Sequence, residues 1–329
     1  GRRNPAFHLR FVFEGEEEAG SPHLGAYLER YPDALRPDAW ILCDGPVHPS
    51  GRAELAFGAR GITTLEMTVY GPVKGLHDGH YGNWAPNPAV RLASLVASMR
   101  DDDGSIRIRG FGADVRPPSA ADLAALNEIP DVEPALRGEF QIGGTEGGGV
   151  RLDALLMRPA LNVRGIQSGR VGARATNSIP TEARASLDFR LVPDQTPESA
   201  RALVERHIGG LGCTIVRSPP DSAARMASVE LVLLEWGAGY PPARTALDAP
   251  LSREVAGLLS AMGRDPVRLP MLGGSIPMHL FQQPAGRPAI VLPIANHDDN
   301  QHAPNENLRL RNLWDGIEVF ATLFAEMKR

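Results

Sequence analysis

The run from Glu182 to Val192 constrains the fold most, because apolar and polar side chains alternate through all of it. Such alternation predicts a long strand with one buried face and one polar face, and it places Arg190 on the polar face. The stretch from Ile62 to Tyr70 alternates in the same way. The chain therefore contains a sheet that is covered on one side.

Helix signals accompany these strands. Asn87 and Pro88 are a typical N-cap and first position for a helix that ends at Met99. A second helix starts at Thr196-Pro197 and ends near Gly209-Gly210. We expect a compact α+β domain over residues 61–240. Within it, residues 100–160 are rich in Asp, Gly and Pro and are predicted to be insertions, with a helix near Ser119 to Leu126.

The flanking segments follow another pattern. His8 to Phe13 and Trp40 to Cys43 are predicted to be buried strands, with a short helix from Pro22 to Tyr31 between them. Acidic residues follow both strands. After residue 240 come further predicted elements: a helix after Asp248, strands at Val267–Leu269 and Ala289–Leu292, and an apolar-striped helix over Leu310–Phe324. We therefore expect residues 1–60 and 241–329 to be two parts of one α/β domain, with acidic side chains at one edge of its sheet.

Composition limits the function classes. The 329 residues are 43% hydrophobic and 22% charged, with a net charge of -5 and no basic cluster, which argues against nucleic acid as a partner. Two separated cysteines fit a reducing compartment. Without an apolar run of about 18 residues, we expect a cytoplasmic protein that is not inserted in a membrane.

The first predicted strand leads into the acidic cluster Glu14, Glu16, Glu17 and Glu18. Four carboxylates so close together repel one another, so they must stay hydrated or be offset by cations such as metal ions. The alternative is a solvated acidic turn at a helix start, where the helix dipole favours negative charge.

A second polar cluster precedes the last helix, in the segment NHDDNQHAPNENLRL. It offers imidazole and carboxylate groups, the usual ligands of zinc and manganese: His297, Asp298, Asp299, His302 and Glu306. A solvated loop with a helix-capping acid explains the same residues.

Six short motifs occur in one order along the whole chain: EGEEEAGS, LCDG, LHDG, the strand with Arg190, GGSIP and HAPNE. In this combination the sequence resembles the aminoacylase and carnosinase family of two-zinc metallopeptidases, most closely its dipeptidase branch. The resemblance implies a catalytic α/β/α sandwich, incomplete at its N-terminus, at residues 1–60 and 241–329. It also implies an inserted α+β lid and dimerisation domain at 61–240, and a homodimer.

The resemblance also implies roles for single residues. Glu17 corresponds to the general base, Glu18 and His302 to metal ligands, and Asp44 to a ligand of the other metal. The expected cofactors are two divalent metal ions, zinc first, with manganese and cobalt as alternatives. Glu14 and Glu16 remain outside the metal site.

The substrate side of the site is implied in the same way. His77 of LHDG corresponds to a histidine that stabilises the oxyanion in the partner subunit's active site. His80, in the same loop, is a second candidate for this role. The alternative for His77 is a surface histidine without a catalytic role. The groups that hold the substrate's carboxylate correspond to Asn177, Arg190, Gly274 and Ser275. Arginine suits that task because its planar fork pairs bidentately with carboxylate. A surface salt bridge with Asp188 or Glu182 is the alternative for Arg190.

The resemblance predicts metal-dependent hydrolysis of dipeptides or short peptides with a free carboxylate, through a metal-bridging water activated by Glu17. N-acyl amino acid deacylation is the alternative. In the family, a histidine of an HxD motif and an aspartate that bridges the two metals precede the pair of glutamates that corresponds to Glu17 and Glu18. The sixteen residues before Glu17 contain no HxD motif. We therefore expect either a fragment of a longer enzyme or an inactive dimeric homologue.

Overall fold

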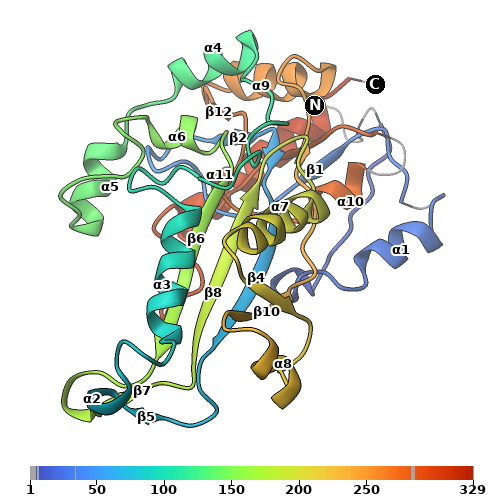
Figure 1. The fold of residues 1–329 in the computed structure, drawn as a ribbon. Coiled ribbons are helices and arrows are strands. Elements are labelled where there is room, and N and C mark those ends of the chain that lie inside the picture. Colours follow the sequence, from blue (N-terminus) through green and yellow to red (C-terminus); the bar gives the residue numbers. More distant parts are fainter. Residues whose placement is uncertain (1–4, 6, 34, 283–285, 329) are drawn as a thin grey trace.

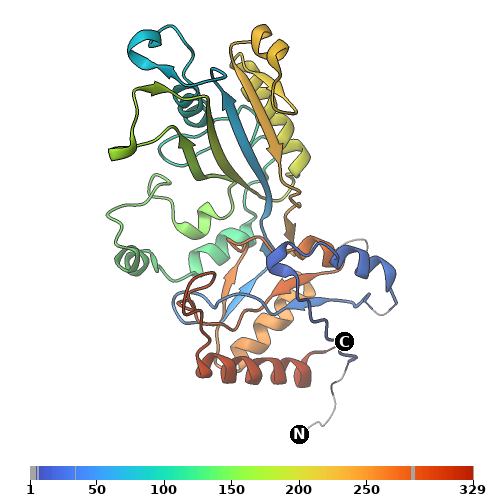
Figure 2. The same ribbon diagram turned by 90° about the horizontal axis from the view of Figure 1, so that it is seen from below.

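The structure, a computed structural model, describes residue 5 and residues 7–33, 35–282 and 286–328. The elements form two lobes, and both ends of the chain belong to the same lobe (Figure 2). Each lobe contains one main sheet, and the two sheets differ in how they are covered.

The lobe with the chain ends is built on a four-stranded sheet. Its strand order is β1 (Trp40–Leu42), β13 (Ala289–Val291), β2 (Glu54–Ala56) and β12 (Val267–Leu269). β1 is parallel to β13 and β12 is parallel to β2, while β13 and β2 are antiparallel. The strands predicted at residues 40–43, 267–269 and 289–292 are confirmed.

Both faces of this sheet are buried. Side chains alternate across a strand, so Leu55 packs toward one face and Ala56 toward the other. Leu55 meets helices α9 (Pro250–Ala261) and α11 (Leu310–Glu326), whereas Ala56 lies in a core with Met278 of α10 (Met278–Gln282). This gives a three-layer arrangement of helices, sheet and helices, as the resemblance implied.

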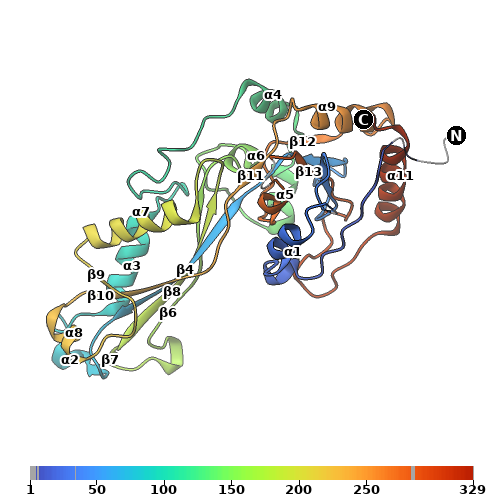
Figure 3. The ribbon, with the colours of Figure 1, turned by 90° about the vertical axis from the view of Figure 1, so that its right-hand side faces the viewer.

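The second lobe contains the one-sided sheet that the alternating strands predict. Its order is β6 (Ala160–Ser168), β8 (Glu182–Leu191), β4 (Gly61–Tyr70), β10 (Leu231–Trp236) and β9 (Thr214–Val216). Helices α3 (Pro88–Met99) and α7 (Pro197–Gly210) share one core with the apolar side chains of the sheet (Figure 3). Both predicted helix starts are confirmed, since Asn87 accepts a hydrogen bond from the Ala89 amide and Thr196 forms a capping box.

A small tip closes the far end of this lobe (Figure 1). It contains β5 (Leu76–His77), α2 (Asp78–Tyr81) and β7 (Ser178–Ile179), with β5 and β7 antiparallel. The short helix α8 (Ser222–Ala227) and the 3₁₀ turn η2 (Gly172–Arg174) also belong to this lobe.

Residues 120–157 return to the four-stranded sheet. They form α4 (Ala120–Glu128), α5 (Glu133–Phe140) and α6 (Leu152–Leu155), of which α4 contacts β12 and α6 lies beside β2 in Figure 1. Leu126, Ile129 and Met157 join the core around Ala56. The predicted insertion therefore completes a core of the other lobe.

The lobes are joined by closely packed backbone. β3 (Gly58–Ala59) pairs with β11 (Ala243–Arg244), and Ile62 and Tyr240 exchange two backbone hydrogen bonds of 3.0 and 2.9 Å. A methyl group on Gly61 would lie 2.5 Å from the nitrogen of Pro242, so glycine is required there. We call this region, residues 57–62 with 237–244 and the turn 273–275, the junction.

The strand predicted at His8–Phe13 is wrong. These residues have no regular structure, and the Phe13 side chain is 93% exposed. A strand needs a neighbour for its backbone groups, and none of the described segments pairs with this one. Phe11 instead meets the ring of Phe324 edge-on, at 5.8 Å between centroids.

No helix in the described parts of the chain is both long and apolar enough to cross a membrane.

Candidate active site

The acidic cluster folds into a single 3₁₀ turn, η1 (Glu17–Ala19), followed by α1 (Leu24–Arg30). Two of its acids are occupied locally: Glu14 accepts from the Glu16 amide at 3.0 Å, and Glu16 pairs with His23 at 2.8 Å. Glu17 and Glu18 take no part in these contacts. Glu14 and Glu16 thus have local partners, whereas Glu17 and Glu18 are left for contacts with other segments of the chain.

The second polar cluster meets the first at Glu18. The Nε2 atom of His302 lies 3.3 Å from Oε2 of Glu18, although the residues are far apart in sequence. His302 has a left-handed backbone, with φ of +62°, and such strain in a non-glycine residue is enriched at functional sites. Of the other candidates in this loop, Asp298 is paired with Arg309 and hydrogen-bonded by Asn296.

Asp44 follows β1 and completes this group. Desolvation raises the pKa of Asp44, and the charge of Glu18 raises it further, against a backbone hydrogen bond from Gly45. The pKa of Glu17 is raised by desolvation and then by Asp44, Glu18 and Glu14, whereas His302 lowers it. The carboxylates are therefore close enough for their charges to repel one another.

Such a group suits a divalent cation. Carboxylate and imidazole are the donors that zinc and manganese take, and a cation would relieve the repulsion among the acids. Within the described ranges, no three His, Cys, Asp or Glu side chains converge closely enough to hold a metal ion by themselves. Glu18, Asp44 and His302 fit as part of a ligand set.

Arg190 lies at the junction, next to the GGS turn. It donates to Asp188 from Nε at 3.1 Å and to the hydroxyl of Ser275 from Nη1 at 2.8 Å. The carbonyl oxygen of Gly274 accepts from the Arg60 amide at 3.4 Å. The structure thus brings together three of the four predicted carboxylate-binding residues, and Arg190 also forms the ion pair with Asp188 considered as its alternative.

Tyr240 connects the acids with the junction. Burial raises the pKa of its hydroxyl to about 12, and the nearby charges of Glu17, Arg190 and Asp188 also act on it. Its ring stacks on His279 with 5.3 Å between centroids. Tyr240 and Arg60 are not among the site residues predicted from the sequence. Their signal is a polar residue beside a glycine, Arg60-Gly61 and Gly239-Tyr240, where the chain passes between lobes.

His77 and Asn177 lie together elsewhere. The carbonyl oxygen of Asn177 accepts from the Asp78 amide at 3.3 Å, and Nδ1 of His77 accepts from the Gly79 amide at 3.1 Å. That bond places the ring proton of neutral His77 on Nε2, on a side chain that is 54% exposed. The ring of His80 is 4.6 Å away. This tip lies at the end of the lobe remote from the four-stranded sheet (Figures 1 and 3).

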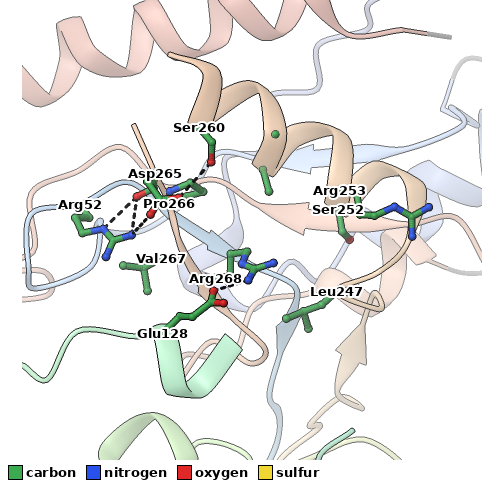
Figure 4. A pocket seen from close by; sticks show the side chains of 12 residues that line it. Arg52, Glu128, Leu247, Ser252, Arg253, Ser260, Asp265, Pro266, Val267 and Arg268 are labelled. Atoms are coloured by element: carbon green, nitrogen blue, oxygen red, sulfur yellow. Dashed lines mark hydrogen bonds and ion pairs between the residues drawn. The ribbon is translucent and has the colours of Figure 1, made fainter. Parts of the chain in front are cut away.

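A hollow of about 490 Å³ lies between α9, β12 and the end of α4 (Figure 4). Four of its charged side chains are paired, Arg52 with Asp265 at 2.9 Å and Arg268 with Glu128, and Arg253 donates to the backbone carbonyl of Asp248. Because these charges satisfy one another and none of the predicted site residues lines the hollow, we do not assign the chemistry to it.

Known proteins resemble this chain both in sequence and in fold. Residues 57–211 match the peptidase dimerisation domain of the M20 peptidases. The chain is 25% identical over 97% of its length to the Cys-Gly metallodipeptidase dug1 of Schizosaccharomyces pombe, and 24% identical over 97% to the Beta-Ala-His dipeptidase of Homo sapiens. A metallo-carboxypeptidase of the M20 family from Sulfolobus solfataricus superposes on 94% of the chain and 68% of its own, with a TM-score of 0.79 and 26% identity. The chain thus contains a match to the M20 peptidase dimerisation domain and is similar to M20 peptidases over nearly its whole length.

Within this M20 family, the similarity is to the dipeptidase branch. The fold of the yeast dipeptidase Dug1p is also shared, with a TM-score of 0.75 and 23% identity over 95% of this chain and 64% of that one. The chain spans 66% and 62% of the length of the two dipeptidases that it matches in sequence. The residues that match the dimerisation domain, 57–211, contain β4, β6 and β8 of the five-stranded sheet.

Proposed function

We propose that the protein of which this chain is part hydrolyses the amide bond of dipeptides or short peptides with a free carboxylate. The observation that carries the proposal is that Glu17, Glu18, Asp44 and His302 come from three separate loops and lie near enough for their charges to interact, with Glu18 and His302 3.3 Å apart. Glu17 and Arg190 also both act on the buried hydroxyl of Tyr240 at the junction. An acid group beside an arginine matches a substrate with an amide at one end and a carboxylate at the other. The names of the M20 dipeptidase relatives support the same substrate class.

Glu18, Asp44 and His302 would hold divalent metal, with zinc as the first choice and two ions as the expected number. When bound, the metal supplies Lewis-acid polarisation of the scissile carbonyl and makes water easier to deprotonate. Glu18 and His302 are already 3.3 Å apart, so little rearrangement is needed to share a ligand.

Glu17 would act as the general base and then as the general acid. Desolvation and its acidic neighbours raise its pKa, which makes its carboxylate a better proton acceptor. It would take the proton of the attacking water and pass it to the leaving amine. Arg190, oriented by Ser275, would hold the substrate's carboxylate and so fix the position of the amide.

His77 would complete the site of a second copy. It lies at the tip with Asn177, remote from Glu17, and it presents an Nε2 proton toward solvent. A neutral imidazole with an exposed N–H can stabilise an oxyanion. The match to a peptidase dimerisation domain supports a homodimer in which this tip reaches the other subunit.

The first test is a Glu17→Gln variant. We expect hydrolysis of Cys-Gly and β-Ala-His by the zinc- or manganese-loaded protein to fall by roughly 100- to 10,000-fold, because the proton acceptor is lost. Metal content, measured by mass spectrometry, should stay unchanged. Glu16→Gln is the matched control, since Glu16 pairs with His23. A fully active Glu17→Gln variant would refute the role of Glu17, and turnover of N-acetylated amino acids alone would assign the protein as a deacylase.

The second test concerns His77. Glu17→Gln and His77→Ala variants should each be nearly inactive, but mixing them in equal amounts should restore roughly a quarter of the wild-type rate. Random exchange makes half of the dimers mixed, and one of the two sites in each is intact. If subunit exchange is shown by native mass spectrometry and no activity returns, His77 does not act in the partner.

A further inference from the structure

Arg60 is a buried arginine at the junction that neither the resemblance nor the proposed mechanism uses. It immediately precedes β4, and only 7% of its surface is exposed. Its Nε donates to the carbonyl oxygen of Leu156 at 3.2 Å, and its backbone amide donates to Gly274 at 3.4 Å. The first bond orients the side chain, and the second holds the backbone of Arg60 against the GGS turn.

The charges around Arg60 do not balance. Burial, followed by the nearby charge of Arg190, lowers the pKa of Arg60 to about 10, and Asp188 acts in the opposite direction. Asp188 already forms an ion pair with Arg190 at 3.0 Å. In the described residues around Arg60, two cations therefore share one carboxylate. A buried excess positive charge is costly unless an anion offsets it.

Hydrogen-bonding capacity is also left over at this place. The two terminal nitrogens of Arg60 donate to no described residue, since Nε makes its one side-chain hydrogen bond. Asp188 is 6% exposed, and its Oδ1 has no hydrogen-bond partner within the described part of the chain. A buried acceptor such as this oxygen is almost always satisfied in native proteins. The unused groups comprise the donors of Arg60 and one acceptor of Asp188, which suits a ligand with a carboxylate next to an N–H group.

We propose that Arg60 is the second arginine of the carboxylate subsite, so that the substrate's terminal carboxylate is held between Arg60 and Arg190. The inference rests on the proposed function and extends it, because it names a residue that makes the site specific for a free carboxylate. Ser275 orients Arg190, Leu156 orients Arg60, and the unpartnered oxygen of Asp188 accepts the amide N–H adjacent to the carboxylate. Substrates with an amidated or extended C-terminus would leave both guanidinium groups unpaired.

The experiment measures binding of N-acetylalanine and N-acetylalaninamide to the full chain by NMR titration. The wild type should bind the carboxylate at least about tenfold more tightly than the amide, because an ionic, bidentate contact is lost with the amide. An Arg60→Met variant should bind the two compounds within about twofold of each other. Arg184→Met, at an exposed position on the same sheet, is the control and should keep the wild-type preference.

A merely structural role for Arg60 would lower thermal stability without changing this preference. If Arg60→Met does not fold, Arg60→Lys decides, since it keeps the charge but loses the planar fork and should lose at least severalfold in preference. Wild-type preference in either folded variant overturns the inference. Hydrolysis of dipeptides is measured separately: an Arg60-dependent preference without turnover would refute the proposed function alone, and turnover with an Arg60-independent preference would refute this inference alone.

Discussion

The two sheets of the molecule place carboxylates in different surroundings. In the five-stranded sheet, Glu66 lies on the polar face and pairs with Arg164 at 3.0 Å, and both side chains are about half exposed. In the four-stranded sheet, Glu54 lies within β2, covered from both sides, and is 4% exposed. Burial raises the pKa of Glu54 to about 8, and the charge of Asp153 adds to the effect.

The difference shows where each lobe can carry function. A sheet with one polar face accepts charged side chains along its strands at little cost, because water solvates them. A sheet covered on both faces does not accept charged side chains at little cost. Its functional acidic residues must therefore lie in the loops after the strands. Asp44 follows β1, and His302 lies in the loop after β13. The candidate site therefore surrounds the end of the four-stranded sheet.

The largest effect expected from this comparison is on packing. Leu55→Ala in β2 should lower the free energy of unfolding by about 3–5 kcal/mol, because a fully buried side chain leaves a cavity between two layers. Val163→Ala in the edge strand β6 should cost less than about 1 kcal/mol, since Val163 is 41% exposed. Urea unfolding of both variants measures the two values. Equal losses would show that the two sheets are covered alike.

A smaller effect should depend on pH. Glu54 has a raised pKa in the folded state, so its contribution to stability is fully present below about pH 4.5 and is lost as pH rises toward 8. Glu54→Gln removes that loss. The stability of this variant relative to wild type should therefore increase by about 2–4 kcal/mol between pH 4.5 and pH 8.

The same substitution in the other sheet is the control. Glu66→Gln, on the polar face, should leave the dependence of unfolding free energy on pH nearly unchanged between pH 4.5 and 8, because that side chain is solvated. Urea unfolding across this range measures both variants. A pH-independent difference between Glu54→Gln and wild type would mean that Glu54 is charged in its buried position.

Local signals in the sequence were enough for the elements with strong periodicity or caps. The helix Pro88–Met99 was predicted to the residue, because Asn87 and Pro88 mark its start. The strand at Glu182–Leu191 followed from alternation, with one exception: Asp188 is buried although it is on the polar register. Its burial depends on Arg190 and the junction, which no local pattern reveals.

Features that depend on distant neighbours could not be predicted in this way. His8–Phe13 has the composition of a strand, but composition does not supply a partner. The edge strand β6 was missed because its exposed side chains give no clear alternation. In the candidate site, the motifs indicated Glu18 and His302, but only the fold shows that they lie 3.3 Å apart. It also shows that Asn177 lies at the tip and not beside Arg190.

The return of residues 120–157 to the four-stranded sheet ties the lobes together mechanically. The chain crosses between the lobes not twice, as a simple inserted module would, but four times, and Leu126, Ile129 and Met157 complete a core that belongs to the other lobe. The segment 120–157 therefore cannot leave the four-stranded sheet without uncovering apolar side chains of that core. Excising residues 57–211, which match the dimerisation domain, would thus remove part of the interior of the four-stranded lobe.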